Sequence, residues 1–103
     1  MSPGEMHQVE QILQALSRYE QRLKGQYDPV RQAGSLANPP VTQAMQHILW
    51  MIGETQQHAE RGHLDKAWRW LCFIQGVAWA LGWGPFSTGP TIDDFRADNR
   101  GKG

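Results

Sequence analysis

Residues 70–81 read WLCFIQGVAWAL, and only Gln75 and Gly76 in this run are not apolar. A membrane span requires about 20 predominantly apolar residues, so the run predicts a buried helix instead. A helix that is apolar on every side has to be covered on every side. This helix is therefore either central in a small bundle or partly covered by a second subunit.

Helical patterns extend outward from this run in both directions. Apolar residues recur at spacings of three and four, and no alternating, strand-like run or internal repeat occurs. We predict one all-α domain over residues 1–103, a bundle of three helices plus a short C-terminal helix. The predicted helices span residues 3–25, 39–61, 64–81 and 91–99.

Capping signals mark the helix ends. Ser2 with Glu5, and Thr91 with Asp94, both have the spacing of a capping box. Asn38 precedes two prolines, which predicts an N-cap for the second helix. Residues 26–38 are expected to form a loop, and residues 85–90 a turn-rich link. Ile92 and Phe95 are expected to pin the last helix to the bundle.

Composition argues against several classes of function. The 103 residues carry ten basic and ten acidic side chains, so no overall field draws the chain to nucleic acid or to an anionic membrane. The single cysteine, Cys72, cannot form an intrachain disulfide, which fits a reducing compartment. The first residues carry Glu5 and no basic apolar leader, so we expect a cytoplasmic protein without a membrane partner.

No motif predicts catalysis, a cofactor or a metal. His58 with Glu54 could supply two metal ligands and His63 lies nearby, but no further ligand is evident and solvated side chains are the simpler interpretation. Cys72 stands between Leu71 and Phe73, an apolar context that predicts an inert thiol. We therefore expect no enzyme, no catalytic residue, no cofactor and no metal site.

Basic and tyrosine side chains alternate near the end of the first helix. Guanidinium groups and rings in this arrangement could hold a phosphate or a small nucleotide. The alternative is a solvated helix face, because Glu20 and Asp28 dilute the charge. The candidate anion-binding residues are Arg18, Tyr19, Arg22, Tyr27 and Arg31.

Tryptophan is concentrated in the third helix and just after it. Large aromatic side chains of this kind form either a core or an interface with another chain. Cys72, Gly76 and Ala80, spaced by four, would let another backbone approach closely. The candidate interface residues are Trp68, Trp70, Phe73, Val77, Trp79 and Trp83.

Two segments carry a family resemblance: residues 69–82, RWLCFIQGVAWALG, and residues 91–100, TIDDFRADNR. They resemble a group of small proteins of tailed bacteriophages and prophages, with a run like RWLGFIQGxLWxxG before a short T-I-x-E/D helix. The resemblance covers residues 42–100 and includes Trp50 and Met51. The chain departs from the pattern at Cys72, where glycine is expected, and by an insertion at residues 83–89.

The resemblance implies phage origin and the cytoplasm of a bacterial host, and it carries no catalytic residue with it. It implies an accessory protein that acts by binding a host protein, with inhibition of a host enzyme or defence protein as the expected consequence. The alternatives are a helical sponge for a nucleotide-type small molecule and, with less support from the charge, nucleic-acid binding. We also predict a homo-oligomer, most simply a dimer, whose interface includes the third helix.

Overall fold

The structure, a computed structural model, describes residues 1–84 and 88–100. In these two ranges the chain forms four helices and no strand: α1 (Pro3–Leu23), α2 (Val41–Glu60), α3 (Leu64–Leu81) and α4 (Ile92–Asp98). The predicted all-α bundle of three helices plus a short fourth is confirmed. Residues 85–87 of the predicted link lie outside the described residues.

Both predicted capping boxes are present. The Ser2 hydroxyl accepts the Glu5 N–H at 3.2 Å, and the Glu5 carboxylate accepts the Ser2 N–H at 3.2 Å. Thr91 and Asp94 make the same reciprocal pair, at 3.1 and 2.8 Å. Each box satisfies amide groups that the first helical turn leaves without a partner, so α1 and α4 begin where the sequence predicts.

The start of α2 differs from the prediction. Pro40, not Asn38, is the N-cap, and no side chain caps the helix. Two consecutive prolines separate Asn38 from the helix, which places its side chain too far back to reach the first free amides. Asn38 instead takes a left-handed φ of 48°, a conformation that asparagine tolerates better than most residues, and turns the loop.

The end of α3 is tied back to α1. Gly82 adopts the left-handed conformation, and its N–H donates to the Ala78 carbonyl at 2.6 Å. Trp83 follows with a φ of 63°, which is uncommon for a residue with a side chain. Its ring is buried against Tyr19 of α1, with 5.2 Å between ring centroids.

The docking of α4 was predicted correctly for one residue of two. Phe95 is buried and meets the Tyr19 ring edge-on at 5.8 Å, whereas Ile92 is 50% exposed. The second anchor is Asp98, which binds Arg18 and Tyr19. The C-terminal part of α4 therefore docks on the bundle, through one apolar side chain, Phe95, and one charged side chain, Asp98.

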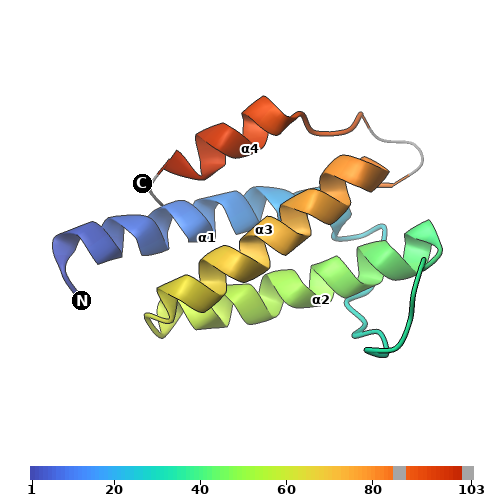
Figure 1. Cartoon of the computed structure of the whole chain (residues 1–103), viewed down its shortest axis with the longest axis horizontal. Coiled ribbons are helices and arrows are strands. Elements are labelled where there is room, and N and C mark those ends of the chain that lie inside the picture. The colour runs from blue at the N-terminus through green and yellow to red at the C-terminus, as the bar shows by residue number, and fades with distance from the viewer. Residues whose placement is uncertain (85–87, 101–103) are drawn as a thin grey trace.

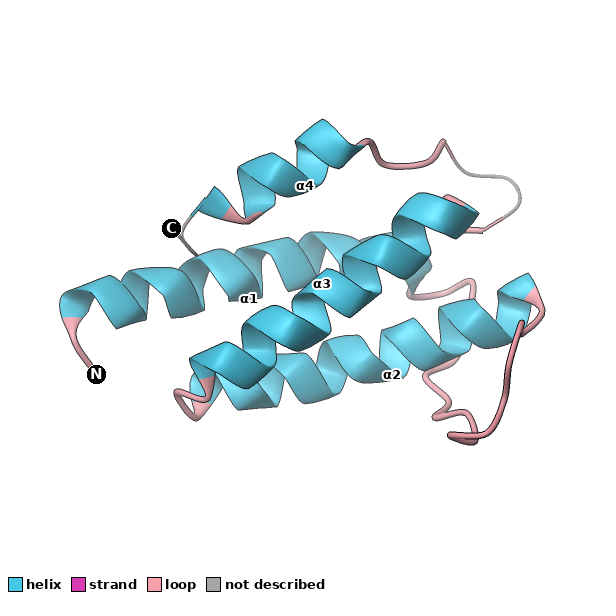
Figure 2. Cartoon of the chain, viewed as in Figure 1, coloured by secondary structure: helices cyan, strands magenta, loops and turns pink. Residues whose placement is uncertain are grey.

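The helices pack in an oblique arrangement. α1 and α2 lie side by side and antiparallel, α3 crosses in front of both, and α4 returns along α1 (Figure 1). A long loop, residues 24–40, connects α1 to α2 and folds back at the end where α2 starts (Figure 2). α3 thus contacts α1 and α2 with one side only.

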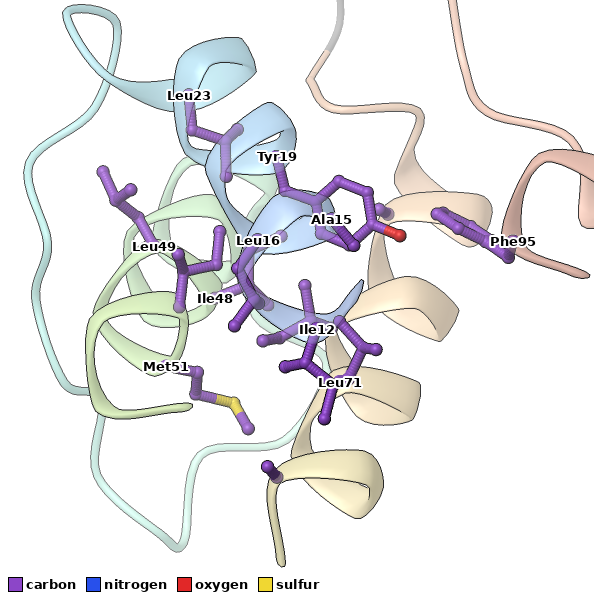
Figure 3. Close-up of a cluster of buried hydrophobic side chains, with 14 of the residues drawn as sticks. Ile12, Ala15, Leu16, Tyr19, Leu23, Ile48, Leu49, Met51, Leu71 and Phe95 are labelled. Carbon is purple, nitrogen blue, oxygen red and sulfur yellow. The ribbon is translucent and has the colours of Figure 1, made fainter. Parts of the chain in front are cut away.

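The core lies where α1, α2 and α3 meet. Ile12, Leu16, Ile48 and Leu71 are among its fully or almost fully buried side chains (Figure 3). Each such side chain contributes roughly 1.5–3 kcal/mol to folding. No helix of the described residues is long and apolar enough to cross a membrane.

Candidate interaction surface

The outer face of α3, defined by Cys72, Phe73, Gly76, Trp79 and Ala80, points away from the bundle. All five residues are exposed, with Phe73 at 53% and Trp79 at 55% of their possible surface. None of the five side chains carries a charge. The structure therefore leaves two large aromatic side chains in contact with water on the second half of α3, where residues 70–81 carry no charge.

Gln75, the one polar side chain in the run 70–81, points inward. Its amide donates to the Tyr19 hydroxyl at 3.0 Å, and it exchanges two hydrogen bonds with the Asn99 amide, at 2.9 and 2.8 Å. The Tyr19 hydroxyl in turn donates to the Asp98 carboxylate. We call Tyr19, Gln75, Asp98 and Asn99 the polar seam. It joins α1, α3 and the end of α4.

The polar seam fixes the rotation of α3. A buried polar group without a partner is costly, so Gln75 is held on the inner side by its bonds. That rotation turns Phe73 outward, since it lies about 160° from Gln75 around the helix. Trp79, four residues after Gln75, lies at the edge between the inner and outer sides and is 55% exposed. Burial and the hydrogen bond to Asp98 raise the pKa of Tyr19, which keeps its hydroxyl a donor.

Beside this face lies an apolar groove of about 820 Å³. One wall is the loop and the start of α2, and the other is the second half of α3. Leu36, 41% exposed, stands on the loop wall. The lining residues are Gln32, Ala33, Gly34, Leu36, Asn38, Pro39, Gln43, Ala44, His47, Ile48, Cys72, Phe73, Gly76, Val77, Ala80 and Leu81. Four of them belong to the outer face, so the groove and that face form one apolar surface, from Leu36 to Trp79.

The loop wall of the groove is held in place by α2. The Gln32 N–H donates to Nδ1 of His47 at 3.1 Å, and the Val30 N–H donates to the Gln46 carbonyl at 3.1 Å. The Arg31 guanidinium lies over the Trp50 ring, 5.3 Å from its centroid. These contacts position the wall before any partner arrives, which lowers the entropic cost of binding.

The groove continues into a row of rings between α2 and α3. Trp50 lies 5.5 Å from His47 and 6.0 Å from Trp70, and Trp70 lies 5.0 Å from His58, measured between ring centroids. Lys66 Nζ lies 5.6 Å from the centroid of Trp70. Among the residues that the structure describes, neither ring nitrogen of His58 has a hydrogen-bond partner.

The six predicted interface residues fall into three groups. Phe73 and Trp79 are exposed and available to another chain, and Trp70 and Val77 are half-buried. Trp68 and Trp83 are each only 4% exposed and belong to the core, Trp68 with its Nε1–H donating to the Gln8 side chain at 2.9 Å. The spacing of apolar residues in the sequence could not separate the three groups. It does not show which side of α3 faces the bundle, and that orientation involves the polar seam.

The five predicted anion-binding residues do not form one site. Arg18 pairs with Asp98 at 2.6 Å, and Tyr19 is buried in the polar seam. Arg31 lies on Trp50, while Tyr27 is half-buried and Arg22 is exposed. Arg18 does line a hollow of about 550 Å³ between α1 and the end of α4, together with Gln11, Gln14 and Asp98.

The remaining described residues include few side chains placed to bind a metal or to act as a nucleophile. Within residues 1–84 and 88–100, no three His, Cys, Asp or Glu side chains are grouped so that they could hold a metal ion. Cys72, expected to be enclosed by apolar neighbours, is exposed on the outer face of α3. Its sequence neighbour Leu71 faces the core, whereas the thiol points to the other side of the helix.

We expect the stability of the fold to depend on pH through two histidines, His47 and His58. Burial and the nearby Arg31 lower the pKa of His47, and burial and the nearby Lys66 lower the pKa of His58. The unfolded chain, with an ordinary histidine pKa of about 6.5, takes up these protons first. The free energy of unfolding should therefore be fully maintained above pH 6.5 and fall as the pH drops below it, until the folded pKa values are passed.

Urea unfolding between pH 7.5 and pH 5 measures this fall. His47→Asn keeps an acceptor near Nδ1, and His58→Phe keeps the ring, but neither replacement titrates. The double variant should show a flatter profile than the wild type. An unchanged slope in the double variant would show that other groups cause the pH dependence.

Comparisons with protein-family models, with curated proteins and with solved structures find no match for this chain.

Proposed function

We propose that the protein acts without catalysis, by binding another protein in the groove between α2, α3 and the loop that carries Leu36. The observation that carries the proposal is the groove itself: an open apolar channel whose loop wall is held by hydrogen bonds to α2. Monomeric proteins seldom expose large contiguous apolar patches, and such patches commonly mark interaction sites.

The chemistry of the groove favours an amphipathic helix as the bound segment. Its floor is apolar, and the polar side chains of its lining are uncharged apart from titratable His47. Helix-in-groove recognition uses such a floor for anchors at spacings of three and four. Because the sequence resembles small phage proteins, we propose that the segment belongs to a protein of the bacterial host, such as an enzyme or a defence protein.

The two alternatives receive less support from the geometry. A nucleotide sponge would need Arg18, Tyr19 and Arg31 free and together, but each is engaged elsewhere within the fold. Nucleic-acid binding would need a basic face, and the formal net charge is +0. The groove, in contrast, has exposed apolar side chains on both walls.

Site-specific photo-crosslinking in cells tests the proposal. A photoreactive amino acid at Leu36 should yield a covalent adduct with one host protein, whereas the same amino acid at exposed Ser17 of α1 should not. Leu36→Asp should lose capture of that protein, while Ser17→Asp retains it. Equal adducts from both positions, or none above background at Leu36, would exclude the groove as the binding site.

A further inference from the structure

We propose that the outer face of α3 binds a second copy of this chain, through an antiparallel pairing of α3 with α3 centred on Gly76. The pairing shares Cys72, Phe73, Gly76 and Ala80 with the groove lining, and it goes beyond the groove proposal because it also buries Trp79, which does not line the groove. α4 packs on α1, and no described residue covers the outer face of α3 (Figure 1).

The outer face of α3 is symmetric about Gly76. Phe73 and Trp79 stand three residues before and after it, and Cys72 and Ala80 stand four before and after it. The order is thus small, aromatic, small, aromatic, small. An antiparallel pair related by a two-fold axis at Gly76 places Cys72 level with Ala80 of the second copy. Phe73 then lies level with Trp79 of the second copy.

This symmetry fits the two requirements of a helix pair. The three small residues let the helix axes approach closely, and the aromatic side chains on either side cover the gap that remains. A two-fold interface must be complementary to itself, and a pattern that reads the same in both directions has this property. None of the five residues brings a charge into the contact.

Charge argues against the parallel alternative. Arg69 is exposed and lies about two turns before Gly76 on the same side of α3. A parallel pair would bring Arg69 of one copy against Arg69 of the other, and like charges in contact disfavour an interface. The antiparallel pair sends the two arginines to opposite ends of the contact.

The available area predicts a weak dimer. Phe73 and Trp79 are each about half exposed, which leaves roughly 100 Å² apiece to bury. With the small residues and the edges of α3, one copy contributes less than the roughly 800 Å² of a standard interface. We therefore expect the mass to change from monomer to dimer over a micromolar range of protein concentration.

Disulfide trapping tests the geometry with the single native cysteine. Ala80→Cys should give a covalent dimer on mild oxidation, because the introduced thiol meets Cys72 of the second copy. Two positions eight residues apart on one helix are about 12 Å apart, so the same pair cannot close within a chain. Wild type and the double variant Cys72→Ser with Ala80→Cys should both stay largely monomeric on a non-reducing gel.

The outcomes separate the geometries and the two proposals. Rapid self-crosslinking of wild type through Cys72 would establish a parallel pair and overturn the antiparallel one. Light scattering should show that Trp79→Asp removes the dimer and that Leu36→Asp keeps it. A wild-type mass that stays monomeric at all concentrations would overturn the dimer, yet photo-crosslinking from Leu36 would still decide the groove proposal separately.

Discussion

Replacing Ile74 with alanine should lower the free energy of unfolding by about 2–5 kcal/mol, the usual cost of a cavity at a fully buried aliphatic residue. Replacing its neighbour Phe73 with alanine should lower it by only about 1 kcal/mol, because the Phe73 ring is half exposed. The two residues are adjacent and equally apolar in sequence, so the difference measures the rotation of α3.

Urea unfolding at several protein concentrations gives both values. Extrapolation to low concentration removes any contribution from self-association, which Phe73→Ala would also weaken. Cys72→Ala, at an exposed position on the same turn, serves as a control that should change stability little. A larger loss for Phe73→Ala than for Ile74→Ala would show that α3 is rotated differently in solution.

Replacing Asp98 with alanine should cost about 2–3 kcal/mol, because it leaves the buried Tyr19 hydroxyl without its acceptor. The loss should appear first at α4, which Phe95 and the Gln75–Asn99 hydrogen bonds also hold against the bundle. Urea unfolding measures the energy, and near-ultraviolet circular dichroism reports the Tyr19–Phe95 contact. Hydrogen exchange should show the amides of α4 opening more easily than those of α3.

Two further variants locate the cause. Asp98→Asn retains one acceptor oxygen and should lose about half as much. Arg18→Met keeps the aliphatic stem and should cost less than 1 kcal/mol, since the Arg18 side chain is 60% exposed and water screens its pairing with Asp98. Equal losses for Asp98→Ala and Arg18→Met would show that the ion pair, and not the bond to Tyr19, holds α4.

Local signals predicted most of the fold. The capping boxes at Ser2 and Thr91 act within a few residues of chain, so their patterns can be read directly. Asn38 was misjudged because two prolines displaced the start of α2.

The polar seam could not be predicted from the sequence, and for that reason the candidate site could not be predicted either. The hydrogen bonds from Tyr19 to Asp98 and from Gln75 to Tyr19 join residues 79 and 56 positions apart. The spacing of residues along one helix does not predict hydrogen bonds between distant residues, so the sequence indicated only that Gln75 interrupts an apolar run. Once its inward direction is known, the exposure of Phe73 and the burial of Trp68 follow from helical geometry.

Because α4 follows the other three helices in the chain, it leaves the ribosome after them. Until α4 docks, the hydroxyl of Tyr19 and the amide of Gln75 are exposed to water, which can form hydrogen bonds with both groups. At this stage the docking site for α4 exposes less apolar surface than it would if the fourth helix were held by apolar contacts alone. The polar seam thus lowers the risk of aggregation in the interval before α4 docks.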